Sequence, residues 1–444
     1  MDPTADQPPL LIRAGRVIDP ATGRDETADV LVVGAFVQRI GSNLDAPKDA
    51  RVIEAEGCLV TPGLIDPHVH LREPGQEHKE SIESGSRAAV AGGFTTVCCM
   101  PNTTPPIDSP EMVRFVIARA EQTARCRVFP VACGTAARAG ERPAEIALCA
   151  RAGAVAISDD GDAIASPGVM RSVLGATAHA GLVFMQHCQE PTLTEGAAMH
   201  AGSVASRLGI TGWPRGAEEL ILERDVRLVA AMHDPAAYHA QHLSSAGSVE
   251  IVRRARDAGL PVTAEASPHH LVLTHDACIT PDGHGADPAA KMNPPLREHS
   301  DTQALRAAVA EGVITVLATD HAPHAHHEKD LPFEQAAFGI VGLETALPLY
   351  AEALVASGAI DWPRLVEMLT LEPARLCGLE HRGLGALAEG GPADVTVIDP
   401  NAQWTLTPEA LAGKSANTPF MGRNMVGRAV ATVVAGRVEH TLPG

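Results

Sequence analysis

Eight short apolar runs alternate with amphipathic segments through the middle of this 444-residue chain. Each run has the length of a strand buried on both faces, and the segments between them place apolar residues three and four positions apart, as helices do. This alternation predicts an α/β fold of the (β/α)8, TIM-like barrel type. The predicted strands are residues 64–71, 94–100, 127–133, 154–158, 182–187, 237–243, 261–266 and 313–319. The predicted helices are residues 81–91, 110–124, 144–152, 168–180, 217–232, 248–258, 302–311 and 342–356.

The two ends of the chain differ from the middle and are similar to each other. Short β-rich segments bounded by turn residues lie at 10–18 and 28–33, and again at 393–399 and 430–438. The tetrapeptide Ala-Gly-Arg-Val occurs once at each end. We therefore expect a small β-sandwich domain built from both termini. The expected divisions are 1–60 and 386–444 for this domain and 61–385 for the barrel.

The composition restricts the partners of the chain. A formal net charge of −19 speaks against a nucleic-acid or anionic-membrane surface, which would need clustered Lys and Arg. The nine cysteines are scattered without a Cys-x-x-Cys pair, and the first residues lack the basic-then-apolar pattern of a signal peptide. No apolar run reaches the roughly 18 to 20 residues that span a bilayer. These features predict a soluble, cytoplasmic protein.

A His-x-His pair, His68 and His70, ends the first predicted strand. Alternate side chains of a strand point the same way, so both imidazoles could bind one metal ion. For an isolated pair, two ordinary polar residues at a strand end are an equally good interpretation. Polar residues at other predicted strand ends favour the metal site, because the ends of parallel barrel strands gather at one rim. These residues are Asp159, Asp160, His187, His242 and Asp320.

Such a set of ligands predicts a hydrolytic metal centre. Zn²⁺ accepts imidazole nitrogen and carboxylate oxygen, and a catalytic site keeps a position open for water. One or two ions per subunit would turn that water into a hydroxide nucleophile near neutral pH. An uncharged amide or imide carbonyl is the expected target.

Five sequence blocks resemble the long-chain class of bacterial dihydroorotases in the amidohydrolase superfamily, and they occur in the order of that family. The resemblance extends through the barrel and both terminal strand regions. The blocks are Asp-Pro-His-Val-His-Leu-Arg at 66–72, Met-Pro-Asn-Thr at 100–103, Ser-Asp-Asp-Gly at 158–161, Lys-Met-Asn-Pro-Pro-Leu-Arg at 291–297 and Thr-Asp-His-Ala-Pro-His at 319–324.

The resemblance implies a ligand set for two ions. His68, His70 and Asp320 would hold the first ion, and His187 and His242 the second. Many relatives bridge the ions with a carbamylated lysine, but none of the five lysines here lies in the fourth strand region. The long-chain class uses an aspartate, and the spacing to the next histidine favours Asp160 over Asp159. Asp159 is expected to be a cap or loop anchor.

The resemblance also implies roles on the substrate side. Asp320 would take the proton of the attacking hydroxide and return it to the leaving nitrogen, as a general acid/base. Arg72, Asn102 and Asn293 would hold the carboxylate and polar ring edge of the substrate. Arg72 follows His70 by two residues, which predicts the same strand face, and its guanidinium suits a carboxylate. His324 is expected to reach the substrate from the last loop.

Most of the 20 histidines must serve other purposes. His326 and His327 are expected on a polar loop. For His269 and His270 we expect packing or hydrogen bonding behind the ligands. The remaining expected non-ligands are His78, His179, His200, His233 and His440.

The predicted activity is that of a zinc-dependent dihydroorotase, which interconverts N-carbamoyl-L-aspartate and L-dihydroorotate in pyrimidine biosynthesis. One alternative is an allantoinase or hydantoinase with a different ring substrate. Another is a non-catalytic dihydroorotase-like partner of aspartate carbamoyltransferase, although such proteins have typically lost metal ligands. A homodimer and a complex with that transferase remain open.

Overall fold

A parallel barrel forms the centre of the molecule, as predicted. The structure is a computed structural model that describes residues 7–442. Eight strands pair in parallel in the order in which they occur along the chain. A parallel bridge between Val69 and His321 closes the barrel between its last and first strands. The strands are β6 (Leu64–Val69), β7 (Phe94–Cys99), β8 (Arg127–Ala132), β9 (Ala156–Ile157), β10 (Val183–Gln186), β13 (Ala237–Ala240), β14 (Val262–Ala266) and β15 (Val316–Leu317).

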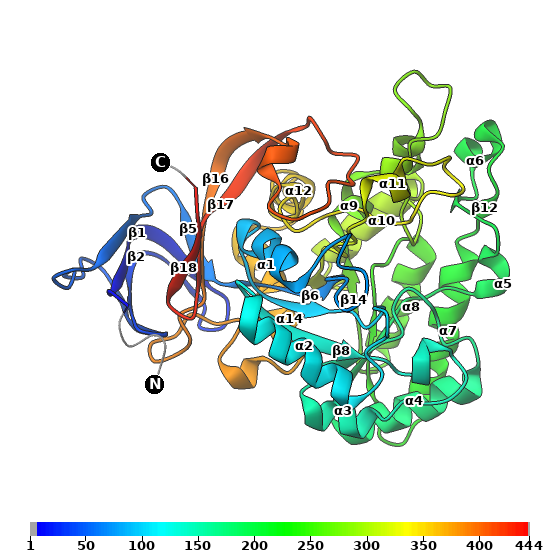
Figure 1. Ribbon diagram of the computed structural model, residues 1–444, viewed down its shortest axis with the longest axis horizontal. Coiled ribbons are helices and arrows are strands. Elements are labelled where there is room, and N and C mark those ends of the chain that lie inside the picture. Colours follow the sequence, from blue (N-terminus) through cyan, green and yellow to red (C-terminus); the bar gives the residue numbers. More distant parts are fainter. Residues whose placement is uncertain (1–6, 443–444) are drawn as a thin grey trace.

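Amphipathic helices surround this barrel, and Figure 1 shows them around the strands. In the second helix Ser109 caps the first turn by accepting from the Met112 amide, and Val113, Val116 and Ala120 form the buried face. The main helices are α1 (Ile82–Ala91), α2 (Pro110–Thr123), α3 (Ile146–Ala152), α4 (Pro167–Ala180), α7 (Gly216–Ala230), α8 (Ala246–Asp257), α10 (His299–Ala310) and α12 (Ala346–Tyr350), which continues as the π-helix η4 (Ala351–Val355).

Several short elements lie outside the predicted pattern. Two of them, α13 (Trp362–Leu369) and α14 (Leu371–Leu376), follow the last predicted helix. The others form excursions at the carboxyl ends of the strands, and Figure 1 places α5, α6 and β12 on the side of the barrel away from the terminal sheet. The excursion elements are η1 (Ala136–Arg138), α5 (Pro191–Thr194), β11 (Met199–His200), α6 (Ser203–Leu208), β12 (Gly212–Trp213), α9 (Pro268–Val272), η2 (His275–Cys278), η3 (Pro288–Ala290) and α11 (His326–Lys329).

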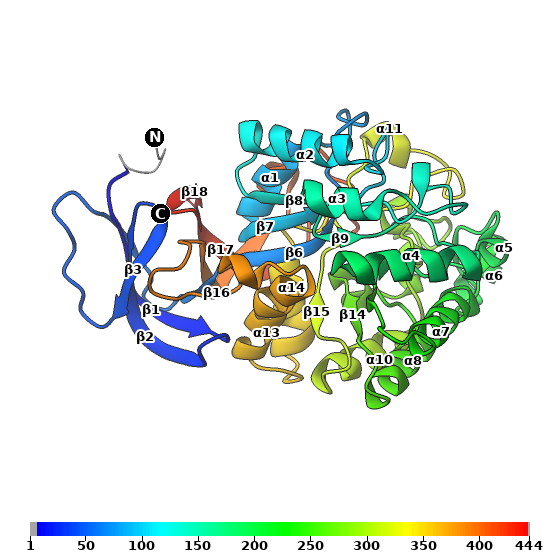
Figure 2. The same cartoon turned by 90° about the horizontal axis from the view of Figure 1, so that it is seen from below.

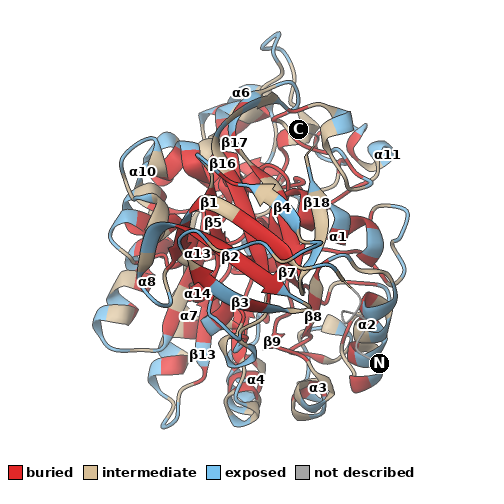
Figure 3. Cartoon of the chain, turned by 90° about the vertical axis from the view of Figure 1, so that its left-hand side faces the viewer, coloured by how far each residue is buried: buried red, intermediate tan, exposed pale blue. Residues whose placement is uncertain are grey.

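Both chain ends build one small sheet domain at one end of the barrel (Figure 2), as the sequence predicts. Strand β5 joins the halves, because it pairs with β1 on one side and β16 on the other. Figure 3 looks onto this end and shows buried strands bordered by exposed loops. The strands are β1 (Leu10–Asp19), β2 (Arg24–Val33), β3 (Phe36–Gly41), β4 (Arg51–Glu54), β5 (Leu59–Pro62), β16 (Val395–Thr405), β17 (Asn424–Val434) and β18 (Arg437–Thr441), with η5 (Glu380–Arg382) and η6 (Pro408–Ala410) nearby.

The repeated tetrapeptide has a structural role. Ala14 and Ala435, its first residue at each end, both have positive φ, at 58° and 48°. Each donates its amide to a buried aspartate, Ala14 to Asp29 (2.8 Å) and Ala435 to Asp394 (2.6 Å). A carboxylate that accepts a backbone amide holds the strained turn in place. The similarity between the ends therefore comes from sheet construction.

Among the described residues, no helix is long and apolar enough to cross a membrane.

Candidate active site

The first barrel strand delivers two buried histidines to the mouth of the barrel. The ring of His68 donates from Nδ1 to Glu265 Oε1 (2.6 Å), and the ring of His70 donates from Nδ1 to Asn102 Oδ1 (2.9 Å). These partners turn both Nε2 atoms toward the centre of the mouth. There His70 Nε2 lies 3.1 Å and His68 Nε2 3.5 Å from Asp320 Oδ1. Such outer hydrogen bonds are typical of metal-binding imidazoles.

Asp160 occupies the middle of the site. Its Oδ1 lies 3.4 Å from His68 Nε2, 3.7 Å from His187 Nδ1 and 3.8 Å from His242 Nε2, and its Oδ2 lies 3.4 Å from His70 Nε2. The carboxylate of Asp160 thus faces four imidazoles at the centre of the mouth. The six predicted ligands therefore converge, although they come from five different strand ends.

Asp159, the neighbour of Asp160, points elsewhere, as the sequence analysis expects. Its Oδ1 accepts the amides of Gly134 (2.9 Å) and Thr135 (3.1 Å), and its Oδ2 accepts the Thr135 hydroxyl. All of these partners belong to the loop after β8. Asp159 is thus a loop anchor.

The backbone at the site is strained. Arg72, His242 and Asp320 have φ values of 61°, 27° and 48°, in the left-handed region that L-residues rarely adopt. Each such residue costs on the order of 1–3 kcal/mol, and such residues cluster at functional sites. The strain also corrects one argument from sequence. Strand β6 ends at Val69, so Arg72 reaches the mouth through a left-handed turn and not along the face of a strand.

The charges of the site favour a cation. Burial opposes the charged form of Asp160, but His68, His242 and His70 hold its pKa well below the usual range. Burial likewise opposes protonation of His68, yet Glu265, Asp160 and Asp320 raise its pKa well above the ordinary value. The acidic side chains around His68 thus favour positive charge at the centre of the mouth.

The donor atoms fit a metal ion. Within residues 7–442, His68 Nε2 and Asp160 Oδ1 are buried without a hydrogen-bond partner, which is costly unless something else fills that role. Two groups of donors lie within 4.8 Å of one another: His68 with His70 and Asp320, and His68 with Asp160 and His242. His187 belongs to neither group, but its Nδ1 lies 2.9 Å from His242 Nε2. Nitrogen and carboxylate donors of this kind suit divalent transition metals.

A cavity of about 270 Å³ opens over this cluster. Arg72 is buried beside it, where its Nε donates to the Pro323 carbonyl (3.1 Å) and its guanidinium reaches His324 Nε2 (3.3 Å). Burial lowers the pKa of Arg72 to about 10, so the group stays charged at neutral pH. Burial and Arg72 lower the pKa of His324 to about 3, so this imidazole is neutral and can accept from Arg72.

Asn102 and Asn293 complete the polar wall of the cavity. Asn102 also positions His70, because its carbonyl oxygen accepts from that ring while its amide nitrogen lies 3.4 Å from Asp160 Oδ2. Asn293 donates to Gln189 Oε1 (3.1 Å), which also accepts from His187 Nε2 (2.9 Å). All four predicted substrate-side residues therefore line one cavity with the metal-type cluster.

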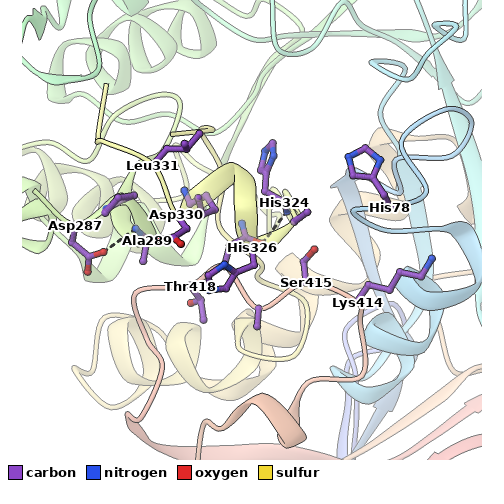
Figure 4. Close-up of a pocket in the computed structure, with 15 residues that line it drawn as sticks. His78, Asp287, Ala289, His324, His326, Asp330, Leu331, Lys414, Ser415 and Thr418 are labelled. Carbon is purple, nitrogen blue, oxygen red and sulfur yellow. Dashed lines mark hydrogen bonds between the residues drawn. The ribbon is translucent and has the colours of Figure 1, made fainter. Parts of the chain in front are cut away.

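A larger cavity of about 520 Å³ adjoins this one through His324 and is shown in Figure 4. Its wall includes His78, His326 and Lys414, and it contains none of the six converging ligands among the described residues. His326 and His327 lie on the short helix α11 and not on the expected loop, but both are exposed and stand apart from the six converging ligands, as expected.

Sequence reasoning missed several supporting residues. Glu265 on β14 binds His68, His239 Nε2 (3.0 Å) and the His242 amide (3.2 Å), so one buried carboxylate orients two predicted ligands. An acidic residue inside a predicted buried strand is the signal that could have revealed it. His270, expected behind the ligands, donates to the Pro294 carbonyl (2.9 Å) and supports the loop of Asn293.

Comparison with known proteins agrees with this geometry. Residues 57–248 match the family model described as dihydro-orotase-like. The dihydroorotase of Pelobacter propionicus is 48% identical over 431 residues, which cover 97% of this chain and 99% of the relative. The dihydroorotase of Anaeromyxobacter dehalogenans strain 2CP-C is 45% identical, with coverages of 97% and 98%. The solved L-hydantoinase (dihydropyrimidinase) of Arthrobacter aurescens superimposes with a TM-score of 0.84 at 25% identity, over 97% of this chain and 95% of that one. The chain belongs to the dihydroorotase family.

Proposed function

We propose that this chain is a dihydroorotase, which interconverts N-carbamoyl-L-aspartate and L-dihydroorotate with loss or gain of water in pyrimidine synthesis. The observation that carries the proposal is the position of Asp160, whose carboxylate faces four imidazoles under a cavity with a buried arginine. Relatives with 48% and 45% identity over nearly the whole chain carry this name.

The six converging side chains would hold one or two zinc ions. His68 and His70 would bind the first with Asp320, His187 and His242 would bind the second, and Asp160 would lie between them. A bound divalent cation supplies a Lewis acid that polarises a carbonyl and lowers the pKa of water toward neutrality. The imidazole and carboxylate donors support zinc over the harder Mg²⁺ and Ca²⁺.

Asp320 would move the proton. In the hydrolytic direction, water attacks the ring carbonyl, the carbon–nitrogen bond breaks, and the leaving nitrogen needs a proton. Burial opposes charge on Asp320, but His68, His70 and His242 hold its pKa below the usual range, so its carboxylate is ionised and can accept the proton of the water. The same oxygen then donates to the nitrogen, and in the cyclising direction the steps run in reverse.

Arg72, Asn102, Asn293 and His324 would hold the substrate. A dianionic N-carbamoyl-L-aspartate needs positive charge at its α-carboxylate, and Arg72 is the arginine in the cavity wall among the described residues. Its guanidinium is already held by Pro323 and His324, so little freedom is lost on binding.

A side-by-side assay of dihydroorotate, allantoin and hydantoin tests the proposal. We expect turnover of dihydroorotate alone. The cavity wall contains no lysine among the described residues, which argues against the carbamylated bridge of hydantoinase-type relatives. Turnover of allantoin or hydantoin at a comparable kcat/KM would favour an allantoinase or hydantoinase instead. Inactivity on all three substrates with metal bound would favour a non-catalytic partner of aspartate carbamoyltransferase.

Other expectations from the sequence remain proposals. We propose a cytoplasmic location from the scattered cysteines of the sequence. From the family resemblance we propose a homodimer and a complex with aspartate carbamoyltransferase that can coexist with catalysis. Gel filtration of the purified chain, alone and mixed with that transferase, tests the two assemblies. We also propose domain divisions after residues 60 and 385, near β5, which ends at Pro62, and ahead of β16, which begins at Val395.

A further inference from the structure

Gln189 joins two parts of the site that belong to different loops. It lies between β10 and α5, two residues after His187. Its side-chain oxygen, Oε1, is 2.9 Å from His187 Nε2 and 3.1 Å from Asn293 Nδ2. The next amide, that of Glu190, donates to the Ala217 carbonyl in α7 (2.8 Å), and Figure 1 shows α5 beside that helix. A single anchored amide therefore touches both a proposed metal ligand and a proposed substrate contact.

His187 faces the mouth through a different nitrogen from its neighbours. Its Nδ1 lies 3.7 Å from Asp160 Oδ1. His68 and His70 instead approach Asp160 with Nε2. An imidazole that binds a metal ion through Nδ1 carries its proton on Nε2, and the hydrogen bond of that second nitrogen fixes the arrangement. Gln189 Oε1 supplies the acceptor for this proton.

The direction of the Gln189 amide is set from its other end. Gln189 Nε2 lies 2.8 Å from Thr194 Oγ1, and this hydroxyl lies 3.2 Å from the Pro191 carbonyl. A carbonyl oxygen can only accept, so the Thr194 hydroxyl gives its proton to Pro191 and accepts from Gln189. The oxygen of Gln189 must then face His187 and Asn293. The backbone of α5 thus determines which atom of Gln189 the site receives.

The same oxygen fixes the amide of Asn293. Because Gln189 Oε1 can only accept, Asn293 presents its NH₂ group to it and keeps Oδ1 for another partner. Within residues 7–442, Asn293 Oδ1 is buried without a hydrogen-bond partner, although the residue lines the cavity of about 270 Å³. A buried acceptor without a partner is costly unless a ligand or water fills that role. An acceptor oxygen suits an N–H group and repels a carboxylate.

We propose that Gln189 is a positioning residue for both neighbours. It holds the proton of His187 on Nε2, which leaves Nδ1 free for a metal ion, and it keeps the oxygen of Asn293 available to an N–H group of the substrate. The inference rests on the proposed dihydroorotase function, from which the roles of the two neighbours come. Gln189 does not line the cavity itself, so it acts only through them.

Zinc affinity tests the first part without any substrate. Metal-free protein is titrated with Zn²⁺ in competition with a chromophoric chelator. Gln189→Met keeps the length of the side chain but removes the amide oxygen, and should weaken the binding of the zinc ion held by His187 about 10- to 100-fold. Gln189→Glu keeps the acceptor and should retain the wild-type affinity. Gln122→Met, which alters an exposed glutamine, is the control and should also retain it.

A double variant tests the second part. KM for dihydroorotate is measured at saturating zinc, where Asn293→Ala should raise it. If Gln189 acts through Asn293, Gln189→Met should raise KM in the wild-type background but add nothing to Asn293→Ala. A side chain that merely supports its loop would raise KM by the same factor in both backgrounds, and that result would contradict the link to Asn293.

Two outcomes of the zinc titration would overturn the link to His187. One is an unchanged affinity in Gln189→Met. The other is an equal loss in Gln189→Met and Gln189→Glu, which would show that the acceptor oxygen is not the cause. If the wild type binds zinc but does not turn over dihydroorotate, the proposed function fails, and the zinc titration still decides whether Gln189 positions His187.

Discussion

Buried aspartates serve opposite purposes in the two halves of this molecule. In the terminal sheet, Asp29 accepts the amides of Ala14 and Leu44, each at 2.8 Å, and Asp394 accepts the Ala435 amide and the Arg127 guanidinium. At the barrel mouth, Asp160 Oδ1 has no hydrogen-bond partner within residues 7–442 and faces three imidazole nitrogens. The aspartates of the terminal sheet accept from backbone amides and an arginine and so hold the fold, whereas Asp160 lies among donors that could bind a metal ion.

The same contrast separates two adjacent residues. Asp159 and Asp160 are equally buried, at 1% and 2% exposure, and follow the same strand. Asp159 gives both oxygens to the loop after β8, and Asp160 gives its oxygens to the centre of the mouth. Residue type and burial therefore do not identify a ligand, but the partners of each oxygen do.

Metal removal should give the largest difference between the two regions. Without a cation, the carboxylates and imidazoles of the mouth lose the charge that holds them together, so turnover of dihydroorotate should fall to the background rate. The terminal sheet depends on amide partners, so far-UV circular dichroism should stay unchanged. Added Zn²⁺ should restore turnover. Full activity after exhaustive chelation, verified by a metal count, would show that the mouth does not depend on a metal ion any more than the terminal sheet does.

Substitution of Asp320 by Asn should give the next largest effect. The amide keeps an oxygen near His70 but cannot carry the proton, so kcat should fall by about 10²- to 10⁴-fold, the usual contribution of a general acid/base. The bound metal should remain, because five other ligands are intact. Asp394→Asn is the matched change in the terminal sheet and should leave kcat unchanged. If Asp320→Asn instead loses its metal, the residue acts as a ligand more than as a proton carrier.

The sequence predicts regular elements far better than excursions. The eight barrel strands are continuous apolar runs and the helices between them carry apolar periodicity, and the structure confirms both. The pairs β11–β12 and η2–η3 have two to four residues per element, too few for a period to show. His200 on β11 and His275 on η2 have ring centroids 5.5 Å apart, a contact that the sequence does not predict.

At the barrel mouth, the sequence predicts where the site residues lie, because they are at strand ends, but it does not predict their hydrogen-bond partners. His68, His70, His187 and His242 lie at the carboxyl ends of predicted strands. Their convergence at one rim therefore follows from barrel geometry. The left-handed turns at Arg72, His242 and Asp320 depend on tertiary contacts, which local sequence does not encode. The sequence shows Glu265 as an acidic residue within a predicted strand. It does not show that His68 and His239 are the partners of its carboxylate.

Replacement of Arg72 by Lys should have a moderate effect that falls mainly on binding. The guanidinium can meet a carboxylate with two parallel donors, and lysine offers a point charge. Loss of one charge-assisted hydrogen bond, about 1.5–3 kcal/mol, corresponds to roughly a 10- to 150-fold rise in KM, with a smaller change in kcat. Arg127→Lys is the matched control, because Arg127 bonds Asp394 in the terminal sheet, and its KM should equal the wild-type value. A kcat loss without a KM change would remove Arg72 from substrate binding.

Substitution of Asp29 by Ala should have the smallest effect and should touch stability alone. The variant leaves the Ala14 and Leu44 amides without their acceptor, which should lower the free energy of unfolding by about 1–3 kcal/mol. Turnover and zinc content should match the wild type, since Asp29 lies in the sheet of the chain termini, outside the mouth. Urea unfolding with parallel assays measures both quantities. A loss of turnover at temperatures where the variant is folded would show that the terminal sheet shapes the mouth, and the division between structural and functional aspartates would then fail.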